Sequence, residues 1–491
     1  MLPSQLYRPS LALLTDLYQL TMAQGWWRAG MHRRDAVFHL FFRKNPFEGG
    51  YAVAAGLQPA LDMLAHYRCD ADDIAFLASV RDPAGAPLFD PAFLQELGNA
   101  RFDCDVLAVP EGTIVFPHEP LLRVQGPLWM AALVETPLLN QINFQTLIAT
   151  KAARVTLAAR GDNVLEFGLR RAQGIDGALA ASRAAYIGGC HSTSNVLAGR
   201  LFGIPVRGTH AHSWVMSFDT EPASFAAYAA AMPSNCVFLV DTYDTLAGVG
   251  HAIEIGRQLR SQGKKLLGIR LDSGDLAWLS QQARALLDAA GFEDAAVVAS
   301  NDLDEHTIES LKHQGAAIAV WGVGTQLVTG GDQPALGGVY KLAAIRDAHG
   351  AWQHKVKLSE QAIKTSNPGI LQVTRCSEGG ELVADMLWDE LHPPGHPWTI
   401  VDPQDATRTR TLDPTTLQAE PLLVSVMDRG TVTYTCPSLH DVRARTQAQL
   451  GSVHSGIKRM LHPHRYPVGL EAGLFARKQA MVLAARGKPR Q

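Results

Sequence analysis

The chain has few cysteines and no long apolar stretch. Its six cysteines are spread over 491 residues and none forms a C-x-x-C pair, so neither a zinc ribbon nor a redox motif is expected. Scattered thiols are typical of a reducing compartment. No apolar run approaches the roughly 18 residues of a membrane span, and the first residues lack a basic segment followed by an apolar one. We therefore expect a cytoplasmic protein that does not use a membrane.

An excess of charge of one sign is also absent. Lys and Arg number 44 and Asp and Glu number 47, which gives a formal net charge of −3. This balance argues against bulk electrostatic binding of nucleic acid. The hydrophobic content of 47% is typical of a globular protein. Because 491 residues are too many for one ordinary core, we expect two or three domains.

The middle of the chain, residues 156–345, alternates short apolar runs with helical segments. Such alternation is typical of parallel strands that helices cover on both faces. The pattern predicts strands at 164–167, 204–206, 236–240, 266–269, 295–298 and 317–321. It predicts helices at 178–187, 193–202, 222–231, 246–262, 276–290 and 305–313. These units indicate an α/β barrel or part of one.

The flanking segments differ from this middle domain. Residues 1–155 combine a helix at 11–27 with alternating stretches at 37–42 and 113–116, a pattern that fits an α+β domain. In the C-terminal segment, 346–491, residues 402–415 are polar and predict a loop. Residues 420–434 predict more sheet, which we expect to return to the N-terminal domain.

Polar or glycine-rich residues follow every predicted strand of the middle domain. In α/β proteins the carboxyl ends of the strands are where ligands and chemistry collect. The alternative is a set of solvated loops with local capping. The candidates are Arg170, Arg171, Thr209, His210, His212, Asp241, Arg270, Asp272, Asp275, Ser300, Gly322, Gly324 and Thr325.

Several of these residues have types suited to anions or metals. The guanidinium groups fit phosphate or carboxylate, or salt bridges at the barrel rim. Backbone N–H groups at Gly322-x-Gly324-Thr325 could cradle a phosphate, although no dinucleotide fingerprint or P-loop is present. Asp272 and Asp275 could hold Mg²⁺ through water, and Asp275 could equally cap the next helix.

His210 and His212 lie two residues apart, so in an extended segment they would share one face. A zinc pair is one interpretation, although no third ligand stands at a telling distance. Packing of a buried ring against the core is the other.

Six motifs in order resemble one family, the nicotinate phosphoribosyltransferases. They lie at 14–22, 42–51, 166–174, 208–213, 270–275 and 322–327, and 462–466 resembles the family more loosely. The resemblance implies an irregular, incomplete (β/α) barrel of the type II phosphoribosyltransferase kind, with an α+β domain built from both chain ends. It implies transfer of phosphoribosyl from 5-phosphoribosyl 1-pyrophosphate to nicotinate, with Mg²⁺ and with ATP as co-substrate, in NAD salvage. It also implies a homodimer with shared active sites.

The resemblance also implies roles for single residues. His212 would be phosphorylated by ATP, Phe167 would stack on the pyridine ring, and Tyr18 would face that ring from the neighbouring subunit. Arg270 and Thr209 would bind the nicotinate carboxylate, with Arg170 nearby. The remaining residues would hold the ribose phosphate (Ser300, Gly322, Gly324, Thr325) and orient ribose or metal (Asp241, Asp272).

His210 stands where nicotinamide-specific relatives carry an aspartate after Gly-Thr. An aspartate would repel a carboxylate and a histidine would not, which favours the acid over the amide. The alternatives are a nicotinamide or quinolinate phosphoribosyltransferase, a type I phosphoribosyltransferase and a non-catalytic nucleotide-binding barrel. A Schiff-base lyase is disfavoured because Lys264 and Lys265 precede a predicted strand.

Overall fold

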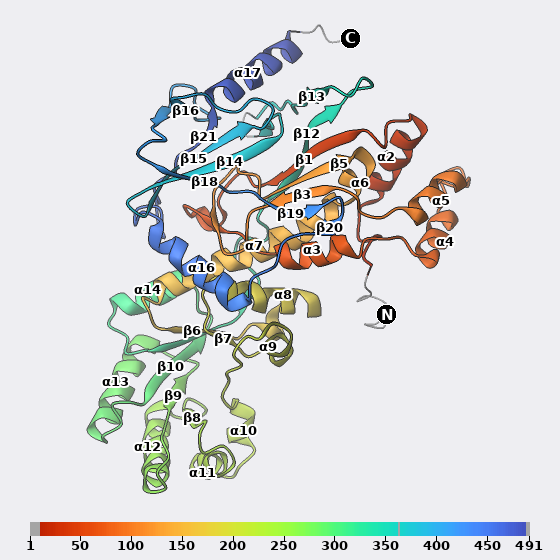
Figure 1. Ribbon diagram of the computed structural model, residues 1–491. Coiled ribbons are helices and arrows are strands. Elements are labelled where there is room, and N and C mark those ends of the chain that lie inside the picture. The colour runs from red at the N-terminus through yellow and green to blue at the C-terminus, as the bar shows by residue number, and fades with distance from the viewer. Residues whose placement is uncertain (1–9, 362–363, 488–491) are drawn as a thin grey trace. The chain divides into compact units, whose positions relative to one another are not determined.

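The computed structural model describes residues 10–361 and 364–487, and the start of the chain, judged above for a targeting segment, lies outside this part. The chain forms two compact units (Figure 1). Unit 1 contains the residues up to 146 together with 335–438 and 444 onward, and unit 2 contains 147–334 and 439–443. The domain boundaries expected at 155/156 and 345/346 stay a prediction.

Unit 2 is built on a parallel sheet with the strand order β7-β6-β11-β10-β9-β8. Within the described residues no ladder joins β8 to β7, so the barrel is incomplete, as expected. The strands are β6 (Asn163–Glu166), β7 (Ser192–Thr193), β8 (Val237–Leu239), β9 (Gly268–Leu271), β10 (Ala296–Asn301) and β11 (Val320–Val323).

The strand expected at 204–206 is wrong. Only Val206 pairs, through a single parallel bridge to Thr193. Pro205 offers no N–H to a ladder, and both Pro205 and Val206 are exposed. Only one side chain of the run, Ile204, is buried, so burial of apolar surface does little to hold it against the sheet.

The helices of unit 2 begin where the capping residues predict. Asn195, Thr220, Asp244, Asp275 and Asp304 each accept a backbone N–H of the first turn that follows, which satisfies a donor that the helix leaves free. The helices are η2 (Leu169–Arg171), α8 (Gly174–Ile187), α9 (Val196–Phe202), α10 (His212–Met216), α11 (Glu221–Ala231), α12 (Thr245–Ser261), α13 (Leu276–Ala289), α14 (Glu305–His313) and α15 (Thr325–Val328). The helix α7 (Glu135–Ala158) contributes its second half to this unit.

Unit 1 contains a seven-stranded sheet with the order β13-β12-β1-β5-β3-β19-β20 and a small pair, β2 (Ala52–Val53) with β4 (Ile114–Val115). Strands from both chain ends pair in the large sheet, because β12 lies beside β1 and β19 lies beside β3. Of the segment 420–434 expected to return to the N-terminal domain, β19 and β20 lie in this sheet, whereas residues 420 and 421 belong to β18 of another sheet. The strands are β1 (Asp35–Phe41), β3 (Asp105–Ala108), β5 (Leu122–Pro127), β12 (Val339–Arg346), β13 (Trp352–His354), β19 (Val424–Asp428) and β20 (Thr431–Val432).

A six-stranded sheet in unit 1 has the order β17-β16-β21-β15-β14-β18. Its strands are β14 (Leu371–Glu378), β15 (Glu381–Asp389), β16 (Trp398–Val401), β17 (Thr409–Leu412), β18 (Gln418–Pro421) and β21 (Val468–Glu471). The loop expected at 402–415 is thus wrong in part, because β17 pairs with β16 along one polar edge. Backbone pairing at a sheet edge does not require apolar side chains, so composition concealed this strand.

The helices of unit 1 complete the fold. They are α2 (Leu17–Arg28), η1 (Pro46–Glu48), α3 (Leu57–Ala65), α4 (Ala71–Ser79), α5 (Pro91–Asn99), α6 (Leu128–Leu133), α16 (Leu439–Ser452) and α17 (Ala472–Arg486). The first residues of α16, 439–443, belong to unit 2. Among the described residues, no helix has the length and apolar character to cross a membrane.

Candidate active site

Arg270 is the centre of a hydrogen-bonded network at the carboxyl ends of β9 and β10. Its Nε donates to Ser300 Oγ at 2.7 Å, its Nη1 to Thr209 Oγ1 at 3.1 Å and its Nη2 to Asp272 Oδ1 at 2.9 Å. The Arg270 side chain is only 14% exposed. Because a guanidinium group is planar and has donors on two sides, these three contacts fix its orientation. The structure brings together four residues predicted from three strand ends.

Two aspartates extend this network. The Asp272 carboxylate accepts hydrogen bonds from Ser300 and Arg270. Burial raises the pKa of Asp272, but the Ser300 hydrogen bond and the Arg270 charge outweigh it and hold the pKa below the usual range. Asp241 Oδ2 accepts from the Asp272 N–H and from Ser273 Oγ, both at 2.7 Å. Asp241 Oδ1 is buried and has no hydrogen-bond partner among the described residues.

His212 lies beside these aspartates, but at the start of a helix rather than at a strand end. It is the first residue of α10, because the strand expected before it does not form. Its Nδ1 lies 3.1 Å from Thr242 Oγ1 and its Nε2 lies 3.7 Å from Asp272 Oδ2. With 39% of the side chain exposed, the ring is accessible to a substrate. Thr242 was missed as a site residue, although it directly follows Asp241.

The His210 ring packs into an apolar cluster. It packs edge-on against Tyr228 at a centroid distance of 4.9 Å, with Phe225 and Phe238 around it. Burial lowers the pKa of His210 to about 4, so the ring is neutral, and its Nε2 accepts the Leu239 N–H at 3.3 Å. The packing interpretation is confirmed for His210, and in the described part of the chain no cluster of three metal-ligating side chains includes it.

Phe167 packs against β11 at Gly322, which has no side chain. A Cβ placed on Gly322 would lie 2.8 Å from Phe167 Cδ2, which is closer than two carbon atoms approach. The Phe167 N–H donates to Val323 O at 2.8 Å. The Arg270 guanidinium carbon lies 5.8 Å from the ring centroid. Gly322 therefore allows an aromatic face and a cation to lie side by side.

A cavity of about 610 Å³ adjoins this aromatic ring within unit 2. Its volume is in the range of small-molecule sites. Phe167 and Thr209 line it, together with apolar side chains of the sheet such as Leu165, Val298 and Val320. The cavity offers a planar ligand an apolar surface beside polar groups.

Glu166 is a buried site residue that the sequence reasoning missed. It is 1% exposed, and its Oε2 accepts hydrogen bonds from Ser182 Oγ at 2.8 Å and Thr193 Oγ1 at 2.5 Å. Its Oε1 accepts the Gly168 N–H. These bonds tie the turn that carries Phe167 to α8 and β7. A carboxylate inside an apolar run was the available signal, because a buried charge needs partners.

The other predicted residues lie outside this network. Arg170 and Arg171 are exposed on η2. Gly324 and Thr325 lie where β11 leads into α15. Asp275 caps α13, with its Oδ1 accepting the Trp278 N–H at 3.1 Å, and its contact with Mg²⁺ stays a prediction. Tyr18 belongs to unit 1, where it is 48% exposed on α2.

Comparison with known proteins covers nearly the whole chain. Residues 13–143 match the nicotinate phosphoribosyltransferase (NAPRTase) N-terminal domain, 163–367 match the NAPRTase family and 371–478 match the NAPRTase C-terminal domain. The nicotinate phosphoribosyltransferase of Bacillus subtilis is 42% identical over 96% of this chain and 95% of its own length. The enzyme of that name from Homo sapiens is 38% identical over 94% of this chain and 95% of its own.

The fold agrees with a solved structure. The crystal structure of human nicotinic acid phosphoribosyltransferase matches with a TM-score of 0.82 and 34% identity, covering 95% of this chain and 99% of that chain. This match confirms the fold class expected from the resemblance. Three matching segments in order and this identity leave one assignment: the chain belongs to the nicotinate phosphoribosyltransferase family.

Proposed function

We propose that this chain transfers the phosphoribosyl group of 5-phosphoribosyl 1-pyrophosphate to nicotinate, giving nicotinate mononucleotide and pyrophosphate for NAD salvage. The observation that carries the proposal is the Arg270 network beside Phe167, which offers a fixed cation next to an aromatic face. The cysteines are scattered and none forms a C-x-x-C pair, which is typical of a reducing compartment, and we assign the reaction to the cytoplasm.

The nicotinate carboxylate binds at Arg270 and Thr209. A planar carboxylate matches the guanidinium fork, and the Thr209 hydroxyl lies 3.1 Å from Arg270 Nη1. The pyridine ring stacks on Phe167, which lines the 610 Å³ cavity. Arg170 follows Phe167 in the same turn and is exposed on η2. Its guanidinium group is placed to bind a phosphate or carboxylate group of a ligand that stacks on Phe167.

Selection of the acid over the amide follows from the charge beside Thr209. His210 is neutral and turned into the Tyr228 cluster, so no carboxylate follows Gly208-Thr209 there. An aspartate at that position would accept a hydrogen bond from an amide and would repel an acid.

The sugar phosphate binds at Ser300, Gly322, Gly324 and Thr325, where β10 and β11 end. Asp241 and Asp272 orient the ribose. The transferred group develops positive charge at its anomeric carbon, so the ionised Asp272 stabilises it electrostatically and positioning supplies much of the rest.

The carboxylates also fit Mg²⁺. Asp241 Oδ1 is buried without a hydrogen-bond partner among the described residues, Asp272 is ionised, and oxygen ligands suit a hard cation. Bound there, Mg²⁺ would neutralise charge on the leaving pyrophosphate.

ATP couples to the reaction through His212. Its Nδ1 contacts Thr242 and its Nε2 makes no hydrogen bond at 3.7 Å from Asp272, so Nε2 is the nucleophile. A nitrogen–phosphorus bond forms to the γ-phosphorus, the bond to the bridging oxygen breaks and ADP leaves. Water later cleaves the phosphohistidine to inorganic phosphate.

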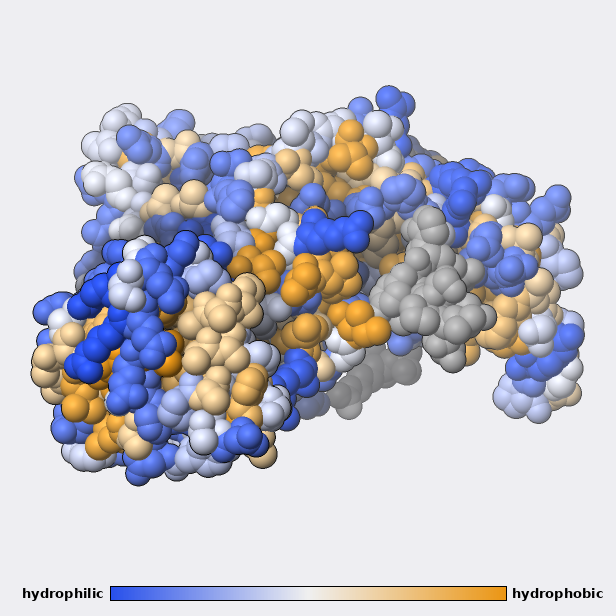
Figure 2. Space-filling model, turned by 90° about the horizontal axis from the view of Figure 1, so that it is seen from below, coloured by the Kyte–Doolittle hydropathy of each residue, from blue (hydrophilic) through white to orange (hydrophobic). Residues whose placement is uncertain are grey.

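A second copy of the chain completes the site. Tyr18 is 48% exposed beside Leu17 at 54% on α2, and Val196 of α9 is 70% exposed. Figure 2 shows hydrophobic surface, in orange, on the face seen from below. Large exposed apolar side chains of this kind are typical of an interface, and we assign Tyr18 to the partner's pyridine site.

Mass balance with the purified chain tests the reaction. Nicotinate, 5-phosphoribosyl 1-pyrophosphate, ATP and Mg²⁺ should give mononucleotide and pyrophosphate in equal amounts, with ADP formed in parallel. Nicotinamide and quinolinate replace nicotinate in matched runs and should give little product. Tight binding of the sugar phosphate without release of pyrophosphate would instead indicate a non-catalytic binding protein.

The role of His212 is tested by His212→Ala. We expect this variant to lose ATP coupling and to retain some uncoupled transfer. The exposed His306 of α14 supplies the control variant His306→Ala, which should behave as the unchanged chain. Acid-labile label from γ-labelled ATP that persisted in His212→Ala would place the phosphate on another residue.

A further inference from the structure

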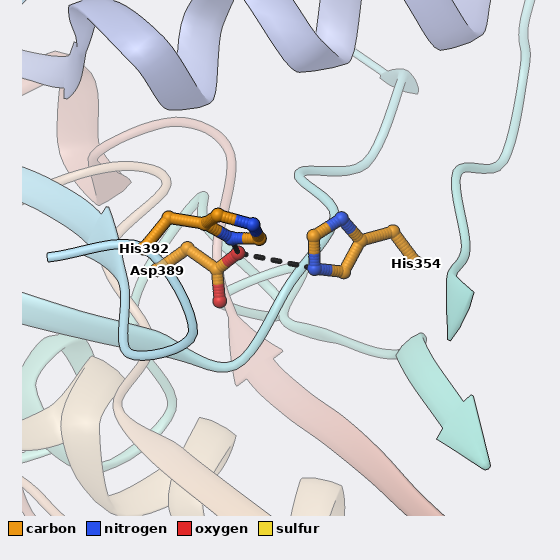
Figure 3. Close-up of side chains that lie close together, drawn as sticks. All are labelled: His354, Asp389 and His392. Atoms are coloured by element: carbon orange, nitrogen blue, oxygen red, sulfur yellow. Dashed lines mark hydrogen bonds and ion pairs between the residues drawn. The ribbon is translucent and has the colours of Figure 1, made fainter. Parts of the chain in front are cut away.

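A cluster of metal-ligand side chains lies in unit 1, apart from every residue used above. His354 ends β13, Asp389 ends β15, and His392 follows three residues later (Figure 3). His354 Nε2 and His392 Nδ1 each lie 3.0 Å from Asp389 Oδ2. The three ligand atoms all lie within 4.8 Å of one another. Across residues 10–361 and 364–487 this is the one such group.

The carboxylate at its centre is rigidly held. The Asp389 side chain is fully buried, and its Oδ1 accepts the backbone N–H groups of Ile370 and Leu391 at 3.0 and 3.2 Å. Gly369 has a φ of +107°, and a Cβ there would lie 2.9 Å from Asp389 Cγ. The missing side chain lets the backbone approach, and Oδ2 is left directed at the two imidazoles.

The nitrogen of His354 has the character of an unused ligand. His354 Nε2 is buried and makes no hydrogen bond within the described chain, although it lies 3.0 Å from Asp389 Oδ2. Arg477, on α17, is the remaining cation there, and its Nη2 lies 3.8 Å from the same oxygen, too far to hydrogen-bond. A buried ring nitrogen that faces a carboxylate oxygen at 3.0 Å without the alignment of a hydrogen bond needs an explanation, and a cation bound between the two supplies one.

We propose that His354, Asp389 and His392 bind a divalent transition-metal ion of the zinc class, with water as the fourth ligand. Two imidazole nitrogens and one carboxylate suit zinc, whereas Mg²⁺ and Ca²⁺ prefer oxygen ligands. Zinc bonds of about 2.0–2.2 Å place tetrahedral ligands about 3.3 Å apart. The 3.0 Å separations are close to that value, so small side-chain rotations admit the ion.

The ion would join two sheets of unit 1. His354 comes from the seven-stranded sheet, and Asp389 and His392 come from the six-stranded sheet and the turn after it. An ion that binds only the folded chain stabilises it. Arg477 Nη2 lies 3.8 Å from Asp389 Oδ2, and its positive charge would repel a dication bound to that oxygen. Binding should therefore be weaker than at a structural zinc site with four protein ligands.

Titration of the full-length, metal-free chain with Zn²⁺ tests the proposal. His354→Gln and His392→Gln each remove one ligand, and His392 is half exposed, so its variant should fold. The control is His349→Gln, which changes an exposed histidine in the turn of the β12–β13 hairpin. Zinc bound equally by all four proteins is subtracted as binding elsewhere.

We expect the unchanged chain and the control to bind about one more zinc ion per chain than either ligand variant. The same two proteins should show a rise in melting temperature with Zn²⁺ and a visible absorption band with Co²⁺, and the ligand variants should lose both. Any rise in melting temperature with Mg²⁺ should be the same in all four proteins, because Mg²⁺ prefers oxygen ligands. Zinc affinity, stoichiometry and melting temperature that were the same in all four proteins would overturn the site.

Discussion

Replacing Arg270 by lysine tests the acid-binding role of the network most directly. Lysine keeps the positive charge but carries its donors on one nitrogen, so it cannot span the contacts at 2.7, 2.9 and 3.1 Å to Ser300, Asp272 and Thr209. A hydrogen bond to a charged group contributes about 1.5–3 kcal/mol. With part of the network retained, nicotinate binding should weaken by about 1–3 kcal/mol, or about 5- to 150-fold in KM.

The assay is steady-state kinetics with nicotinate varied at saturating 5-phosphoribosyl 1-pyrophosphate. The KM for nicotinate should rise more than the KM for the sugar phosphate, because the change removes a carboxylate partner. Arg257→Lys, on an exposed position of α12, is the matched control. Thermal unfolding of both variants separates a local effect from a loss of folded protein. An unchanged KM for nicotinate in folded Arg270→Lys would remove Arg270 from acid binding.

Two further changes test the packing around this network. Gly322→Ala puts a methyl group 2.8 Å from the Phe167 ring, and overpacking of this kind costs about 1–3 kcal/mol. We expect a several-fold higher KM for nicotinate in kinetic assays. An unchanged KM would mean that the Phe167 ring does not contact the base. His210 has a pKa of about 4 in the folded chain against about 6.5 in the unfolded chain. The unfolded state therefore binds more protons between these two pH values. The free energy of unfolding falls as pH decreases through this window, by on the order of 3 kcal/mol. Denaturant unfolding at pH 7 and pH 4 should show a smaller loss for His210→Gln than for the unchanged chain, and equal losses would contradict a buried neutral ring.

The sheet of unit 2 was predictable because its signals are local. Apolar runs separated by capped helices indicate parallel strands, and the carboxyl ends of such strands share one edge. That rule placed Arg270, Asp272 and Ser300 together, and their hydrogen bonds agree with it. Thr209 joins them although the strand expected before it does not form.

Features that depend on distant partners were not predictable. The direction of the His210 ring is set by Phe225, Tyr228 and Phe238, which follow it in the chain and form a pocket only after α11 and β8 pack. The 204–206 run had strand composition but no second ladder to join. Similarly, His354 and Asp389 come from different sheets, and their spacing in sequence matches no metal motif.

The incomplete barrel explains why a histidine can stand at position 210. Among the described residues, no strand lies between β8 and the bridge at Val206 to pair with the free edge of β8. On this edge His210 Nε2 accepts the Leu239 N–H at 3.3 Å, which would otherwise lack an acceptor. An imidazole can accept this N–H only in its neutral form, and burial against Phe238 keeps it neutral. A carboxylate could accept the same N–H but would bring a negative charge next to Thr209 and the acid that we propose it binds. One side chain therefore satisfies the open edge of the sheet and adds no negative charge beside Arg270, which already pairs with Asp272.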